Sequence, residues 1–126
     1  MAVTKTTTIT ALAGILVVDF DANSSSENNV TGNSSGTLYL VDVDNTKNPS
    51  QPAYVRIRDA ASAVPSHAAN GVPTWVFMAP PGPKMSYAMP EGQPYSAGLS
   101  MWCTVNNTKQ NISSPTNAVT VKIVAS

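Results

Sequence analysis

Alternating apolar and polar residues run through the second half of the chain. From residue 99 to 105 every second side chain is apolar, namely Leu99, Met101, Cys103 and Val105, and the opposite face carries Ser100, Trp102 and Thr104. Near the end of the chain, Val119, Val121 and Ile123 alternate in the same way with Thr120 and Lys122. A period of two is that of a strand with one face in a core. Both segments are therefore predicted to be β-strands.

Shorter segments follow the same pattern. Val55 and Ile57 alternate with Tyr54, Arg56 and Arg58, and Met85, Tyr87 and Met89 alternate with Ser86 and Ala88. Residues 38–43 and 75–78 are apolar on both faces, which is typical of a strand covered twice or of one whose outer face meets another protein. Residues 6–21 predict either one long strand or two strands broken at Gly14.

Segments rich in Ser, Asn, Gly and Pro separate these strands and favour turns. They are residues 22–36, 45–52, 79–83, 90–94 and 106–115. With ten prolines, the chain leaves room for only one short helical turn, at residues 60–63. Seven or eight short strands with such turns predict an all-β fold, an antiparallel β-sandwich of the Ig-like or jelly-roll-like kind.

Length and charge narrow the possible partners. A chain of 126 residues predicts one domain, 1–126, with a possible N-terminal arm at 1–10 and a polar loop at 22–36. Seven basic residues balance seven acidic ones, so no net field attracts phosphates or anionic lipids. The apolar run at residues 11–18 is far shorter than the ~20 residues of a membrane-spanning helix. We therefore expect neither nucleic acid nor a membrane as a partner.

Candidates for catalysis are few. His67 is the single histidine and Cys103 the single cysteine; Cys103 falls on the inward face of its strand, where a thiol is protonated and inert. The pairs Asp19/Asp21 and Asp42/Asp44 offer oxygen ligands for calcium, or else simply end strands and open turns. The sequence shows no known catalytic or cofactor-binding motif. We therefore predict no catalytic, metal or cofactor-binding residues and a protein that is not an enzyme.

Outward-facing aromatic and basic residues are the candidates for binding another protein. They are Tyr54, Arg56, Arg58, Trp75 and Trp102. Trp102 points away from the apolar face of its own strand, so a second layer, a partner subunit or a ligand must cover it. Only 11% of residues are charged, which leaves few charged side chains to protect sheet edges and favours association into an oligomer.

The order of these segments resembles that of a known group of proteins. The resemblance lies in residues 40–46 and 54–64, in Met89-Pro-Glu-Gly92, in residues 96–105 and in residues 118–124. Over about residues 37–125, the chain resembles small tailed-phage virion β-sandwich proteins of the capsid decoration or cement type. It is a resemblance of layout and includes no active-site motif.

The resemblance implies a structural role on the virion. It implies a β-sandwich on the virion, with decoration of the capsid as the leading role. We therefore expect a protein on the outer capsid surface that binds across subunits of the major capsid protein and stabilises the head, with a homotrimer as the favoured oligomer. The alternative is a tail or fibre attachment module that binds a host receptor or a carbohydrate through exposed aromatic side chains.

Overall fold

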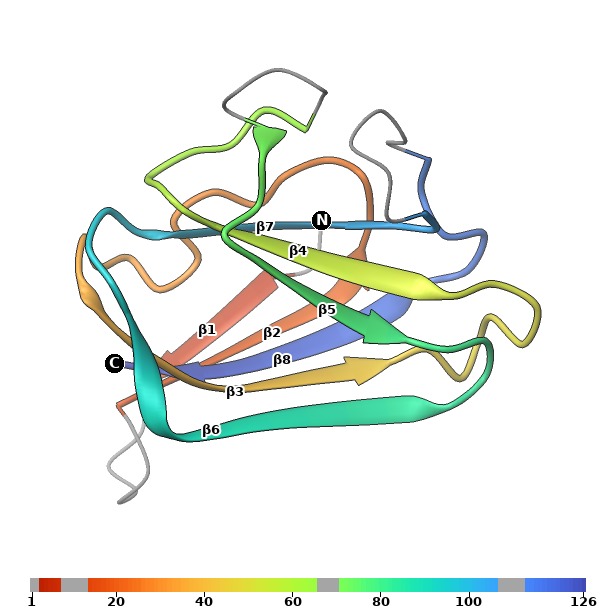
Figure 1. Ribbon diagram of the computed structural model, residues 1–126, viewed down its shortest axis with the longest axis horizontal. Helices are drawn as coiled ribbons and strands as arrows, with labels where there is room; N and C mark the ends of the chain where they lie inside the picture. The colour runs from red at the N-terminus through yellow and green to blue at the C-terminus, as the bar shows by residue number, and fades with distance from the viewer. Residues whose placement is uncertain (1–2, 8–13, 66–70, 107–112) are drawn as a thin grey trace.

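The chain is all-β in the computed structural model, which describes residues 3–7, 14–65, 71–106 and 113–126 (Figure 1). Within these ranges there are eight strands and no α-helix. The strands are β1 (Val3–Thr7), β2 (Ile15–Ala22), β3 (Gly36–Asp44), β4 (Ala53–Asp59), β5 (Trp75–Ala79), β6 (Lys84–Tyr95), β7 (Leu99–Thr104) and β8 (Val119–Ala125). No helix able to cross a membrane is found in this described part of the chain.

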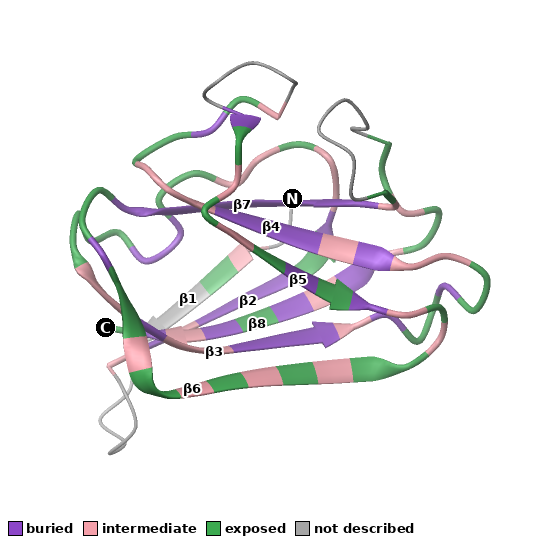
Figure 2. Ribbon diagram, in the orientation of Figure 1, coloured by how far each residue is buried: buried purple, intermediate pink, exposed green. Residues whose placement is uncertain are grey.

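Two antiparallel sheets pack face to face around one apolar core. The larger sheet has the order β1-β2-β8-β3-β6 and the smaller one the order β5-β4-β7. Buried side chains line the space between the sheets, while residues 84–90 of β6 alternate between exposed and half-buried (Figure 2). The predicted antiparallel β-sandwich is confirmed.

The strand pairing has the order of a jelly roll. Strand β2 pairs with β8, β3 with β6 and β4 with β5. Between β2 and β3, residues 23–30 run along the edge of β7: Glu27 and Met101 exchange two backbone hydrogen bonds of 2.8 and 2.9 Å, and the Cys103 N–H donates to the Asn23 carbonyl at 2.7 Å. The first half of the chain thus pairs with the second half in reverse order, like a long hairpin wound into two sheets.

The two strongest strand predictions are confirmed in detail. Leu99, Met101 and Cys103 of β7 face the core, as do Val119, Val121 and Ile123 of β8. Val105 follows the end of β7 and is half-buried. A strand with one face in a core needs only this local alternation, which is why the sequence reveals it.

A bulge explains why residues 38–43 look apolar on both faces. Leu38 points into the core, and Tyr39 lies between the register positions of Leu38 and Leu40. Because the extra residue shifts the alternation by one, Val41 and Val43 point inward while Leu40 and Asp42 point outward.

Residues 90–94 were predicted to be a turn, and that prediction is wrong. They continue β6, which is an edge strand, and proline is tolerated where the missing N–H would face away from the sheet. Four residues, Met89 to Gly92, lie opposite Tyr39 alone. Gly92 has φ 77°, and a Cβ there would lie 2.1 Å from Cγ2 of Thr37. Only glycine fits this bend.

Two further predictions need correction. Residues 3–7 of the predicted N-terminal arm form β1, paired along its whole length with β2. Residues 60–63 form no helical turn; they are held instead to the segment before β3, where the Ala63 N–H donates to Oδ1 of Asn28 at 3.1 Å. Of the two alternatives for residues 6–21, two separate strands are observed, and residues 8–13 lie outside the described ranges.

Candidate docking surface

The outer face of the three-stranded sheet carries most of the predicted interface residues. Val55 and Ile57 of β4 are fully buried in the core, so Tyr54, Arg56 and Arg58 point outward. Arg56 lies between Val76 of β5 and Trp102 of β7. In the next row, Tyr54 lies between Met78 and Thr104.

The part of this face over β7 is covered within the chain itself. Trp102 is 1% exposed and Arg56 is 3% exposed. Nη2 of Arg56 donates a hydrogen bond to the carbonyl of Asn106, and burial lowers the pKa of the guanidinium below its ordinary value. Trp102 lies outside the core cluster, as its outward direction predicts. Neither side chain is accessible to a partner of the folded chain.

Trp75 does not share the outer face. It lies opposite Ile57 in the register of β4 and β5, so it faces inward and packs half-buried against the core. Residues 75–78 are all apolar, so the sequence shows no alternation that would distinguish inward from outward side chains. The outward residues of β5 are Val76 and Met78.

The part of the face over β5 is exposed and apolar. Val76 is 41% exposed and Met78 is 36% exposed, and Val72, which precedes the strand, is 40% exposed. We call these three residues and the half-buried Tyr54 the β5 patch. Exposed apolar side chains gathered in one place mark a surface that binds another molecule. Phe20, an exposed apolar residue of the larger sheet, is separate from this patch.

Hydrogen bonds and ring packing fix the β5 patch in place. Nη1 of Arg58 donates to the carbonyl of Val72 at 2.7 Å, and the Tyr87 hydroxyl donates to the carbonyl of Met78. The rings of Phe77 and Tyr87 lie 5.4 Å apart, centroid to centroid, and join β5 to β6. These contacts hold the backbone of the patch, so binding need not order it.

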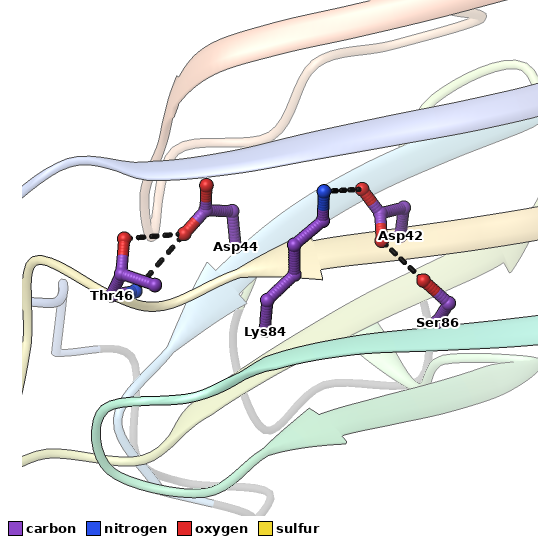
Figure 3. A network of polar contacts seen from close by, with 5 residues as sticks. All are labelled: Asp42, Asp44, Thr46, Lys84 and Ser86. Atoms are coloured by element: carbon purple, nitrogen blue, oxygen red, sulfur yellow. Dashed lines mark hydrogen bonds and ion pairs between the residues drawn. The ribbon is translucent and has the colours of Figure 1, made fainter.

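The carboxylates of Asp42 and Asp44 serve the fold. Asp42 accepts a hydrogen bond of 2.5 Å from the Ser86 hydroxyl and lies 3.4 Å from Nζ of Lys84 (Figure 3). Asp44 accepts from the hydroxyl and the N–H of Thr46 at 2.6 and 3.1 Å, and these bonds lower its pKa. In the described ranges no group of three or more acidic, histidine or cysteine side chains is placed to hold a metal ion.

Asp19 differs from the other carboxylates because it is buried without a full set of partners. Its Oδ1 accepts from the N–H of Asp21 at 3.0 Å, while its Oδ2 is buried and has no hydrogen-bond partner among the described residues. Burial raises the pKa of Asp19, and repulsion from Glu27 and Asp21 adds to the effect. The charged form of Asp19 therefore destabilises the fold.

We expect Asp19→Asn to stabilise the protein at neutral pH by about 1–2 kcal/mol, because it removes a buried and poorly partnered charge. A carboxyl whose pKa is raised by folding binds its proton more tightly in the folded state, so stability falls as the pH rises above the ordinary value of 3.8. Urea unfolding across this pH range should show that the advantage of the variant disappears in acid. A constant difference at all pH values would contradict the assignment.

Cys103, the thiol considered as a possible nucleophile, is inert in the structure. Cys103 is fully buried, and burial raises its pKa to about 12. Its possible partner in a dyad, His67, lies outside the described residues. A thiol with such a pKa is not a nucleophile at neutral pH.

A shallow hollow of about 440 Å³ lies beside the bend of β6. Its lining comes from the single segment Met89 to Gln93, in which Glu91 is the charged residue. One segment supplies groups from one side only, whereas ligand pockets enclose most of their ligand. The β5 patch is therefore the stronger candidate.

The sequence pointed only partly to the β5 patch. Tyr54 is one of the predicted interface residues, and residues 75–78 are apolar on both faces. Val72 lies in the connection before β5 and gave no signal, because a single valine in a loop has no periodicity. The fold thus defines an antiparallel jelly-roll sandwich with an exposed apolar patch on one sheet. Beyond this class, no family model, curated protein or solved structure matches the chain.

Proposed function

We propose that this protein is a non-enzymatic decoration protein of a phage capsid, docking on the major capsid protein through the β5 patch. The observation that carries the proposal is that Val76 and Met78 follow one another on the outer face of β5, with Val72 just before the strand, and that each is more than a third exposed. Burying apolar surface contributes about 25 cal/mol per Å², reduced by the cost of immobilising the protein.

Three features support the placement on a virion. The layout of residues 37–125 resembles that of small virion proteins of this type. The jelly-roll sandwich is an architecture that viral capsid domains share, although fold alone does not establish function. The surface carries few charges, and weak apolar contacts repeated over a capsid lattice gain strength through multivalency.

We expect the purified protein to add saturably to capsids that lack it, and the double variant V76D/M78D to bind at least about tenfold more weakly. Two carboxylates in the patch would have to lose water on docking, which costs more than tenfold in affinity. Quantitative co-sedimentation with purified capsids measures the binding, and far-UV circular dichroism verifies that the variant is folded.

The control is Phe20→Asp, which puts one carboxylate on an exposed apolar residue of the other sheet. Its capsid binding should stay close to that of the wild type. Equal binding by V76D/M78D and the wild type would refute the role of the patch. Absence of binding by the wild type, or density for it on the tail and not the head in an electron cryo-microscopy map, would refute decoration.

A further inference from the structure

The outer face of the five-stranded sheet carries an apolar row that crosses four strands. Strand register places Leu16 of β2, Val124 of β8, Leu40 of β3 and Ala88 of β6 side by side. Leu16, Leu40 and Val124 are half-buried and Ala88 is exposed. The row lies on the opposite side of the sandwich from the β5 patch. Apolar residues in the middle of an outer face indicate a surface covered by another protein.

The charges beside this row balance one another. The neighbouring row contains Lys122, which is exposed, and Asp42, its cross-strand neighbour, which is 7% exposed and also bonded to Lys84 and Ser86. One row further on, Asp44 lies beside Lys84. Two lysines and two aspartates give the face no net charge. Such a face does not attract a strongly acidic or a strongly basic partner. It is complementary to a surface that carries the same arrangement of lysines, aspartates and apolar residues.

A second copy of the same face meets this requirement. Consider a two-fold axis that lies in the interface, parallel to the strands and between β8 and β3. It places β8 of each copy opposite β3 of the other, so that Val124 faces Leu40 and Lys122 faces Asp42. It also places β2 opposite β6, so that Leu16 faces Ala88. The four residues of the apolar row then meet one another and Lys122 meets Asp42, while Asp44 meets Thr120.

The available area sets the strength of such a contact. Four strands spaced about 4.8 Å apart, over the seven residues of β8 at about 3.3 Å each, cover roughly 440 Å² per copy, or about 900 Å² for the pair. Specific interfaces below about 1,200 Å² are weak and transient. The contact is thus large enough for reversible association and too small for a permanent complex.

We infer that the outer face of the five-stranded sheet is a self-association surface, on which a second copy of this chain docks about a two-fold axis between β8 and β3. This pairing differs from the homotrimer that we expect from the sequence. It does not rest on the proposed capsid binding, because the β5 patch belongs to the other sheet and stays free in the pair.

The test uses two single variants, Val124→Lys and Leu40→Glu, followed by sedimentation velocity over a range of concentrations. The wild type should show reversible dimers at high concentration. In each variant alone, the new charge faces an apolar residue twice across the axis, so the dissociation constant should rise at least tenfold. In an equimolar mixture, the new lysine of one copy faces the new glutamate of the other, and the second contact keeps the original leucine and valine. The mixture should therefore form a heterodimer.

Controls make each outcome decisive. Met78→Asp, on the other sheet, should leave self-association unchanged, and circular dichroism should show that both single variants are folded. Association of the mixture but of neither variant alone would establish the pairing of Val124 with Leu40. A wild type that stays monomeric up to its solubility limit, variants that dimerise like the wild type, or a mixture that does not associate would each overturn the inference.

Discussion

Replacing Trp102 with alanine is expected to destabilise the protein by about 3–5 kcal/mol, a large part of the about 5–15 kcal/mol that holds a typical domain folded. Trp102 is almost fully buried although it points away from the core between the sheets. Its removal would leave a large cavity over β7 beside the buried Arg56. Urea unfolding monitored by circular dichroism measures the loss.

Trp75→Ala is the matched control for this prediction. It removes the same atoms from a half-buried position on the edge strand β5, where part of the space is already open to water. Its cost should be less than about 2 kcal/mol. If Trp102→Ala instead kept wild-type stability, the side chain would not be packed as described, and the hypothesis of an exposed aromatic platform for carbohydrate would return.

Asn48→Ala should cost about 3 kcal/mol, because it removes a buried amide that joins two loops. Nδ2 of Asn48 donates to Oδ1 of Asn45 at 3.1 Å and to the carbonyl of Asn117 at 3.0 Å, while its Oδ1 accepts from the N–H of Asn117 at 2.8 Å. Asn45, also buried, donates in turn to the carbonyls of Gln51 and Pro80. Thermal unfolding should show a clearly lowered midpoint.

Two further variants separate hydrogen bonding from the loss of volume. Asn48→Asp keeps the shape and the acceptor but places a carboxylate against two oxygen atoms, so it should be at least as destabilising as alanine at neutral pH and recover partly in acid. Asn33→Ala, on the exposed loop before β3, should change stability by less than about 0.5 kcal/mol. Equal stability of Asn48→Asp and the wild type would contradict the amide network.

The candidate surface was partly readable in the sequence because local alternation tells which residues share a face. Tyr54, Arg56 and Arg58 do share the outer face of β4. Alternation does not tell what lies over that face, and here the half over β7 is buried while the half over β5 is exposed. The accessible residues of this outer face are therefore Val76 and Met78, and not the predicted Arg56 and Trp102.

By itself, the sequence determined the all-β class, the inward faces of β7 and β8, and the outward direction of Trp102, since each depends only on the period of two along a single strand. Tertiary structure alone decided the jelly-roll pairing, the burial of Asp19 and Asn48 and the continuation of β6 through its prolines. These features depend on which strands become neighbours and which become edges. Contacts between residues far apart in the chain settle that choice, and no local pattern records them.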